Sequence, residues 1–146
     1  MHVDCYAYIQ YLLYLQKMFD IIAVDISGRH KIDGYYLMVC AAVAASVTAD
    51  HIEKVNQVHI RSFRSESAPD VPSVVRMMEE TVSEIRFGGT IVTEPGDMYN
   101  KPQWLVDSMF SGNFKYEESL SERLCMQLAH HISLSARKLL LRELDI

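Results

Sequence analysis

The sequence lacks the features that mark several large classes of protein. It has only three cysteines, Cys5, Cys40 and Cys125, which are widely spaced and form no Cys-x-x-Cys pattern. This usage argues against a disulfide framework or a thiolate zinc site, and it favours a reducing, cytoplasmic location. Cys40 and Cys125 lie in apolar segments and are interpreted as small core residues. No apolar run reaches the roughly 20 residues of a membrane-spanning helix, so we expect no membrane partner.

Excess positive charge and a Walker-type phosphate loop are also missing. The formal net charge is −5, with 14 Lys and Arg against 19 Asp and Glu, so no overall positive field marks nucleic acid as a partner. Catalytic carboxylates are themselves acidic, however, and a bound divalent cation reverses the local field. A nucleic-acid partner therefore stays open. The chain has no Gly-x-x-x-x-Gly-Lys segment, which disfavours a P-loop nucleotide site.

The composition that is present fits an ordinary globular domain. The chain has 146 residues, of which 49% are hydrophobic and 23% charged, and a domain of this size buries roughly two thirds of the surface of its unfolded chain. Residues 1–17 are aromatic and apolar, and they are interpreted as an N-terminal extension, either helical or translated from an upstream start. Met18 directly precedes the first strand pattern, so we place one domain at residues 18–146.

Hydrophobic periodicity and turn residues predict an α/β order of elements. The predicted strands cover residues 20–25, 35–45, 57–63, 90–93 and 114–116. The predicted helices run from Asp70 to Gly88, from Pro102 to Phe110 and from Ser119 to about Glu143.

Apolar residues at helical spacing predict which face of each helix is buried. The first helix carries a stripe of Val71, Val74, Val75, Met78, Val82 and Ile85. In the second helix we expect Trp104 and Leu105 to face inward. The third begins with a capping box, Ser119 to Glu122, and its stripe is Leu120, Leu124, Leu128, Ile132, Ala136, Leu139 and Leu140.

A carboxylate ends two of the predicted strands. Asp25 ends the first strand ahead of Ser-Gly-Arg, and Glu94 ends the fourth ahead of Pro-Gly-Asp97. If these strands are parallel neighbours, both carboxylates emerge at one edge of the sheet. Two hard oxygen anions held together suit Mg²⁺ or Mn²⁺, which phosphoryl transfer uses to orient the nucleophile and stabilise the leaving oxygen. A third acid would come from the start of the last helix: Glu117, Glu118 or Glu122.

Each of these residues also has an ordinary structural interpretation. Asp25 ahead of Ser-Gly can cap its own turn, and Glu94 ahead of Pro-Gly can be a turn acid. Acids near the start of the last helix are favourable there through the helix dipole alone. His130 and His131 are adjacent on a helix and point about 100° apart, so both cannot easily face one metal. A surface or half-buried histidine is the simpler interpretation of each.

One resemblance is carried by residues 23–29, Ala-Val-Asp-Ile-Ser-Gly-Arg, which are similar to the Asp-Glu-Ala-Gly-Arg-Gly motif that opens type 2 ribonucleases H. Residues 131–138 are loosely similar to the Ala-Ser-Ile-x-Ala-Lys helix of that family. Residues 18–146 as a whole resemble the small uncharacterised archaeal families placed near the ribonuclease H superfamily. Ile26 stands where the motif has its second acid, and His30 stands where it has its last Gly.

The resemblance implies a ribonuclease H-like, three-layer α/β fold. A mixed central sheet would carry helices on its faces, including a long C-terminal helix. The resemblance also implies catalytic roles for Asp25, Glu94 and Glu118, and a Mg²⁺ or Mn²⁺ site formed by these three residues with Asp97. Arg29 would contact a phosphate, since a guanidinium binds phosphate in a bidentate way.

Two functions stay open at this point. One is a nuclease-like, metal-dependent hydrolase that acts on nucleic acid through the carboxylate cluster. The other is a non-catalytic scaffold or interaction module that pairs with a second copy as a homodimer, which Ile26 and the acidic net charge favour. Asp-x-Ser-Gly also resembles the first phosphate loop of the actin and sugar-kinase superfamily, but those proteins close two such domains over ATP.

Overall fold

The apolar run that follows Phe19 and the Ala- and Val-rich run that follows Tyr35 form the two central strands of the sheet. In the computed structural model, which describes residues 5–9 and 17–144, these strands are β1 (Phe19–Ser27) and β3 (Tyr35–Val47). They pair antiparallel over the whole of β1, with Asp25 opposite Ala41. Most of the predicted N-terminal extension, residues 1–17, lies outside the described residues, and residues 5–9 are helical.

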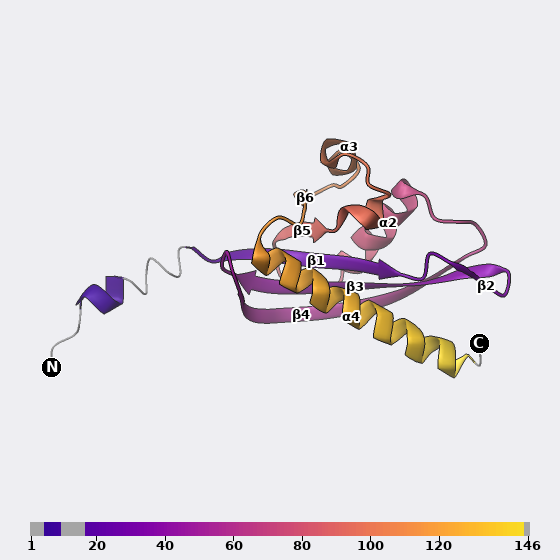
Figure 1. Cartoon of the computed structure of the whole chain (residues 1–146), viewed down its shortest axis with the longest axis horizontal. Helices are drawn as coiled ribbons and strands as arrows, with labels where there is room; N and C mark the ends of the chain where they lie inside the picture. The colour runs from indigo at the N-terminus through magenta and orange to yellow at the C-terminus, as the bar shows by residue number, and fades with distance from the viewer. Residues whose placement is uncertain (1–4, 10–16, 145–146) are drawn as a thin grey trace.

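The other strands extend the sheet in both directions from this pair. They are β2 (Lys31–Ile32), β4 (Ile52–Ser65), β5 (Thr90–Thr93) and β6 (Phe114–Tyr116). The order across the sheet is β4-β3-β1-β5-β6, and the short β2 pairs with the start of β3 (Figure 1). Because β5 runs parallel to β1 and beside it, the condition under which Asp25 and Glu94 emerge at one edge of the sheet is met.

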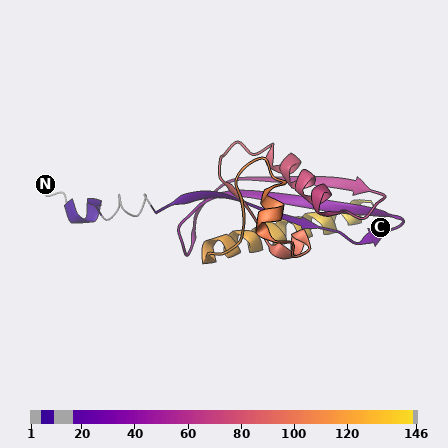
Figure 2. The same ribbon diagram turned by 90° about the horizontal axis from the view of Figure 1, so that it is seen from above.

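Helices cover both faces of this mixed sheet. The helix α2 (Val71–Val82), the 3₁₀ helix η1 (Pro95–Met98) and the short α3 (Gln103–Asp107) pack on one face. The long C-terminal helix α4 (Leu120–Glu143) packs on the other face and crosses the strands obliquely (Figures 1 and 2). Among the described residues, no helix has both the length and the apolarity that crossing a membrane would require.

Successive residues of β1 belong to the two different cores, because side chains alternate across a strand. Ile22, Val24 and Ile26 lie in the core beneath α2. Ile21 and Ala23 lie in the core beneath α4, and Asp25 contacts α4 directly. The two faces of β1 are both buried, which explains why its sequence is a continuous apolar run.

Several elements differ from their predicted extent or orientation. The helix predicted to reach Gly88 ends at Val82, because the amides of Glu84 and Ile85 donate to carbonyls three residues back and form turns. The helix predicted at residues 102–110 covers only Gln103–Asp107.

The predicted strand 57–63 is longer, since β4 begins at Ile52 with the exposed, charged Glu53 and Lys54. Charged residues are tolerated on an edge strand. Because Glu53 and Lys54 interrupt the alternation of apolar and polar residues, the first half of β4 was not predicted. The prediction that Trp104 faces inward is wrong, because its side chain is 74% exposed while Val106 is fully buried.

The buried face of α4 also differs from the predicted leucine stripe. Leu120 and Leu139 are more than half exposed. The buried side is made of small and polar residues together with one methionine: Ser121, Glu122, Cys125, Met126, Ala129 and Ser133. Small side chains let the helix lie close to the sheet, and the leucines then flank the contact. The capping box at Ser119 and Glu122 is confirmed, as is the burial of Cys40 and Cys125.

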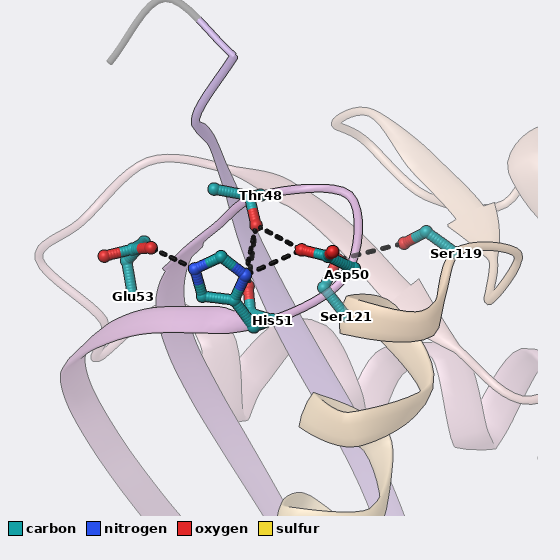
Figure 3. Close-up of polar contacts among 6 residues, drawn as sticks. All are labelled: Thr48, Asp50, His51, Glu53, Ser119 and Ser121. Atoms are coloured by element: carbon teal, nitrogen blue, oxygen red, sulfur yellow. Dashed lines mark hydrogen bonds and ion pairs between the residues drawn. The ribbon is translucent and has the colours of Figure 1, made fainter. Parts of the chain in front are cut away.

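The turn between β3 and β4 lies beside the first turn of α4 (Figure 3). The amide of Thr48 donates to the carbonyl of His51 at 3.0 Å, which closes the turn, and the amide of Ser121 donates to the carbonyl of Ala49 at 3.4 Å. One backbone hydrogen bond therefore joins the end of the sheet to the start of α4.

Candidate metal centre

Asp25 is a fully buried acid on the face of β1 that α4 covers. Its Oδ2 accepts a hydrogen bond from the Ser133 hydroxyl at 2.6 Å, and the Nδ1 of His130 lies 3.4 Å from the same oxygen. The hydroxyl of Ser27 lies 2.7 Å from that of Ser133 and extends the network. The other oxygen, Oδ1, is buried and has no hydrogen-bond partner. Asp25 thus contacts a helix more than 100 residues away in the sequence rather than capping its own turn.

Glu94 and His130 complete a group of three ligand atoms around Asp25. One oxygen from each acid and one ring nitrogen of His130 all lie within 4.8 Å of one another. The parallel register aligns Ala23 with Val92, so Asp25 and Glu94 stand at the same level of neighbouring strands. Glu94 precedes η1 and makes no side-chain capping bond there. Carboxylate oxygens with one imidazole form a donor set that suits Mn²⁺ and related divalent cations.

Asp97 brings a further carboxyl group to the same place from η1. It is 4% exposed, and its Oδ2 has no hydrogen-bond partner. Burial, followed by the negative charge of Asp25, raises the pKa of Asp97 to about 9. Burial and the neighbouring charges of Asp25 and Glu117 likewise raise the pKa of Glu94. Without a cation, like charges at this spacing favour a shared proton, and a divalent cation would remove that cost.

Arg29 is held against the same loop and partly offsets this negative charge. Its guanidinium donates to the carbonyls of Gly96 and Asp97 at 3.2 Å, and lies 3.5 Å from the Asp97 carboxylate. It also stacks over the ring of Tyr99, 4.8 Å from the ring centroid. Arg29 therefore fixes η1 beside the acids, and the predicted phosphate contact would have to use the exposed quarter of its side chain.

Arg137 reaches from α4 to the hairpin that follows Asp25. Its Nε donates to the carbonyl of Leu37 at 2.8 Å. The side chain passes over Gly28, where an added Cβ would lie 2.2 Å from both Arg137 Nε and the Leu37 oxygen. Gly28 also has φ = +99°, a conformation that favours glycine. The Ser-Gly step after Asp25 is therefore needed for this helix to approach the hairpin.

Of the acids at the start of α4, Glu118 and Glu122 lie apart from this group, whereas Glu117 lines a hollow together with Glu94 and His130. The carboxylate of Glu118 is paired with Lys115 at 3.7 Å and its side chain is 70% exposed. Glu122 accepts hydrogen bonds from the amides of Glu118 and Ser119 and pairs with Lys115 at 3.1 Å. Burial alone would raise the pKa of Glu122, but those amides and Lys115 outweigh it and lower the pKa. The structure thus brings Asp25, Glu94 and Asp97 together, and leaves Glu118 outside.

His130 is the site residue that the sequence led us to interpret as a surface or half-buried histidine. The two adjacent histidines point about 100° apart and so were not expected to share a metal, but His130 alone reaches Asp25. The signal that would have found it is the spacing of four between the small residues Cys125, Ala129 and Ser133. These residues define the side of α4 that meets the sheet, and His130 lies next to it.

Two adjoining hollows open over the acids. One, of about 360 Å³, is lined by Asp25, Arg29, Asp97 and Arg137, among others, and the second, of about 280 Å³, lies along α4. Glu94 and His130 line both hollows. We call Asp25, Glu94, Asp97 and His130 the acid cluster. Glu94 and His130 stand at the junction of the two hollows, while Asp25 and Asp97 line only the first.

The fold and site define a mixed α/β protein with a partly buried, carboxylate-rich cluster at adjacent strand ends. The chain belongs to a family described as uncharacterized protein conserved in archaea (DUF2209), whose model matches residues 22–141. It is similar to Uncharacterized protein MJ0095 of Methanocaldococcus jannaschii, with 27% identity over 123 residues that cover 83% of this chain and 96% of that protein. The predicted resemblance to an uncharacterised archaeal family is confirmed, and every residue of the acid cluster lies within the matched range.

Proposed function

We propose that this protein is a divalent-cation-dependent phosphoryl-transfer enzyme, nuclease-like in its action on nucleic acid. The observation that carries the proposal is the convergence of Asp25, Glu94 and His130 within 4.8 Å, beside the buried Asp97. The residues fit a Mg²⁺ or Mn²⁺ ion, since Asp25 and Asp97 each keep one buried oxygen without a partner. Such an ion, when bound, would polarise a phosphate and lower the pKa of a bound water.

The protein's own residues would orient the substrate and hold charges in place around the ion. The hydroxyl of Ser133 orients Asp25 through a 2.6 Å hydrogen bond. Arg29 fixes the loop that carries Asp97 and presents positive charge to the hollow. His130 is half exposed and accessible from both hollows, so it can bind the ion or exchange a proton with solvent.

The order of the strands supports placing the domain in the ribonuclease H-like superfamily. Three antiparallel strands are followed by a helix and a fourth strand parallel to the first, and acids lie at the ends of those two strands. Ile26, which replaces the second acid of the type 2 ribonuclease H motif, is buried in the core beneath α2. In this chain, position 26 therefore faces away from the acid cluster, and His130 would supply a nitrogen ligand to a bound ion.

Titration calorimetry with Mn²⁺ tests the proposal and its ligand set. We expect Asp25→Asn to abolish binding, and His130→Ala to weaken it by about tenfold or more, a typical cost of perturbing a metal site. Glu118→Gln is the matched control, because it removes an acid that lies outside the cluster. Cleavage of labelled single-stranded RNA, single-stranded DNA and an RNA:DNA duplex is then compared with and without Mn²⁺. Unchanged Mn²⁺ binding by Asp25→Asn would overturn the proposal.

A second candidate, a non-catalytic module that forms a homodimer, is favoured by the outer edge of the sheet. In the described part of the chain, β4 pairs only with β3, and its Val55, Val58 and Ile60 are about two-fifths exposed. Charged side chains on an edge strand disfavour its pairing with another chain, but two arginines of β4 lie against the protein instead. Arg61 lies over Phe63 and near Glu80, and Arg64 lies over Tyr35.

Light scattering during size exclusion distinguishes this candidate from the first. A dimer that Ile60→Lys converts to monomer, together with no detectable Mn²⁺ binding, would favour the module. A strict monomer at high concentration would remove it.

A further inference from the structure

The second hollow along α4 contains donor groups that the acid cluster does not use. It is lined by Arg123, Gln127 and His131, together with Glu94, Glu117, Met126 and His130. Arg123, Gln127 and His131 recur every four residues, so they follow one side of the helix toward the cluster. All three are exposed. We call Arg123, Gln127 and His131 the polar track; it lies in the same hollow as Glu94 and His130 of the acid cluster.

Within residues 17–144, the side chains of Arg123, Gln127 and His131 make no hydrogen bond or ion pair, and the ring of His131 lies 5.9 Å from that of His130, centroid to centroid. Arg123 lies near Glu117. Burial raises the pKa of the Glu117 carboxyl, and the positive charge of Arg123 offsets part of that rise. A guanidinium without an ion-pair partner, beside a carboxyl acceptor and an amide, offers both a phosphate contact and hydrogen bonds to a sugar or base.

Positive charge also lies on the opposite side of the acid cluster. The first hollow is lined by Arg29 and Arg137. One terminal nitrogen of Arg137, Nη2, is buried and has no hydrogen-bond partner. A cationic group therefore stands on each side of the carboxylates: Arg123 in one hollow, and Arg29 with Arg137 in the other. A phosphate held at the cluster would have positive charge on both flanks.

We propose that the track of Arg123, Gln127 and His131 binds the nucleotide next to the reacting phosphate, so that the substrate is an internal phosphodiester of a polynucleotide rather than a terminal phosphate. This inference rests on the proposed function. A terminal phosphate or a free mononucleotide would occupy the cluster and one hollow and leave the other empty. A strand that continues in both directions would fill both hollows, and its neighbouring phosphates would face the flanking arginines.

Fluorescence anisotropy with a 5′-labelled 12-nucleotide single-stranded RNA tests the track. The full chain is titrated in Ca²⁺ in place of Mn²⁺, and a denaturing gel verifies that the probe is intact. We expect Arg123→Gln to weaken binding about fivefold or more and to reduce the slope of log K against log salt by about 0.7, the value for one lost phosphate contact on a single strand. Arg142→Gln is the control, because it removes the same charge from an exposed position of α4 outside both hollows.

The same variants in Mn²⁺ calorimetry separate this inference from the proposed function. Arg123→Gln should bind Mn²⁺ like the wild type, which also verifies that it is folded. If Mn²⁺ binds but Arg123→Gln and Arg142→Gln weaken RNA binding equally, the track is wrong and the metal centre stands. If the wild type shows no RNA binding, or binds a labelled mononucleotide as tightly as the 12-mer, the inference is overturned. If the wild type does not bind Mn²⁺, the proposed function fails independently.

Discussion

Two groups of carboxylates around a histidine lie along α4, and their electrostatics are opposite. The acid cluster contacts the middle of the helix, whereas Thr48, Asp50, His51 and Glu53, which we call the turn group, lie beside its start (Figure 3). In the turn group, His51 Nδ1 lies 2.6 Å from Asp50 and 2.9 Å from Thr48, and its Nε2 contacts Glu53. Hydrogen bonds from His51 and Thr48 lower the pKa of Asp50.

The difference between the groups is where the charges find their partners. Asp50 is 75% exposed and receives hydrogen bonds from residues one and two positions away. Asp25 is fully buried, and the pKa values of its neighbours Glu94 and Asp97 are raised. Local contacts satisfy the turn group, while the acid cluster keeps buried oxygens without partners. The same residue types therefore stabilise a turn in one place and form a candidate cation site in the other.

The largest expected difference between the groups is in metal-dependent stability. Saturating Mn²⁺ should raise the melting temperature of the wild type, by about 5 °C or more at a hundredfold excess over Kd. The shift should vanish in Asp25→Asn, which we also expect to be more stable than the wild type without metal, because it removes like-charge repulsion. Asp50→Asn should keep the full shift. Scanning fluorimetry measures the melting temperatures of the three proteins with and without Mn²⁺. An equal shift in Asp25→Asn and Asp50→Asn would show that the acid cluster does not bind the cation.

Packing at the cluster side of α4 provides the next largest effect. Gly28→Ala should lower the free energy of unfolding by about 2–3 kcal/mol, because the methyl group meets Arg137 and the Leu37 carbonyl at a strained φ. Gly34→Ala is the matched control, since Gly34 has φ = +86° but nothing within 4 Å of its added Cβ. Its cost should be about 1 kcal/mol. Urea denaturation compares them, and equal losses would show that strain alone matters at Gly28.

The hydrogen bond from α4 to Asp25 should contribute less than the packing at Gly28. Ser133→Ala leaves a second oxygen of a buried carboxylate without its donor, which should cost about 1–2 kcal/mol. Saturating Mn²⁺ should recover part of that loss, because the cation replaces the missing donor. Chemical denaturation with and without Mn²⁺ measures this recovery, and a loss that Mn²⁺ does not change would contradict it.

The smallest effect is expected at the start of α4 and depends on pH. The folded pKa of Glu122 is lowered, so its contribution is present above the unfolded value of about 4.3 and is lost as pH falls through the folded pKa. Glu122→Gln should cost about 1 kcal/mol at pH 7 and less below pH 4. Urea denaturation at pH 7 and pH 3.5 measures the two values. If the cost of Glu122→Gln instead increased at pH 3.5, the folded pKa of Glu122 would be raised rather than lowered.

The sequence by itself determined most of the sheet and both of its strand-end acids. Continuous apolar runs mark β1 and β3, and Gly-containing turns follow Asp25 and Glu94, so local pattern and turn chemistry were sufficient. The capping box of α4 was equally clear, because it depends on residues three positions apart. These features are local or strictly periodic, and the sequence encodes them directly.

Only the tertiary structure decided which side of α4 meets the sheet, and with it the last member of the cluster. Leucines suggested one face, but close approach to the sheet selected the small residues Ala129 and Ser133 instead. That rotation puts His130 beside Asp25 and leaves Glu118 paired with Lys115. Helix orientation depends on how two surfaces fit, a property of both surfaces together, and the pattern of one helix does not contain it.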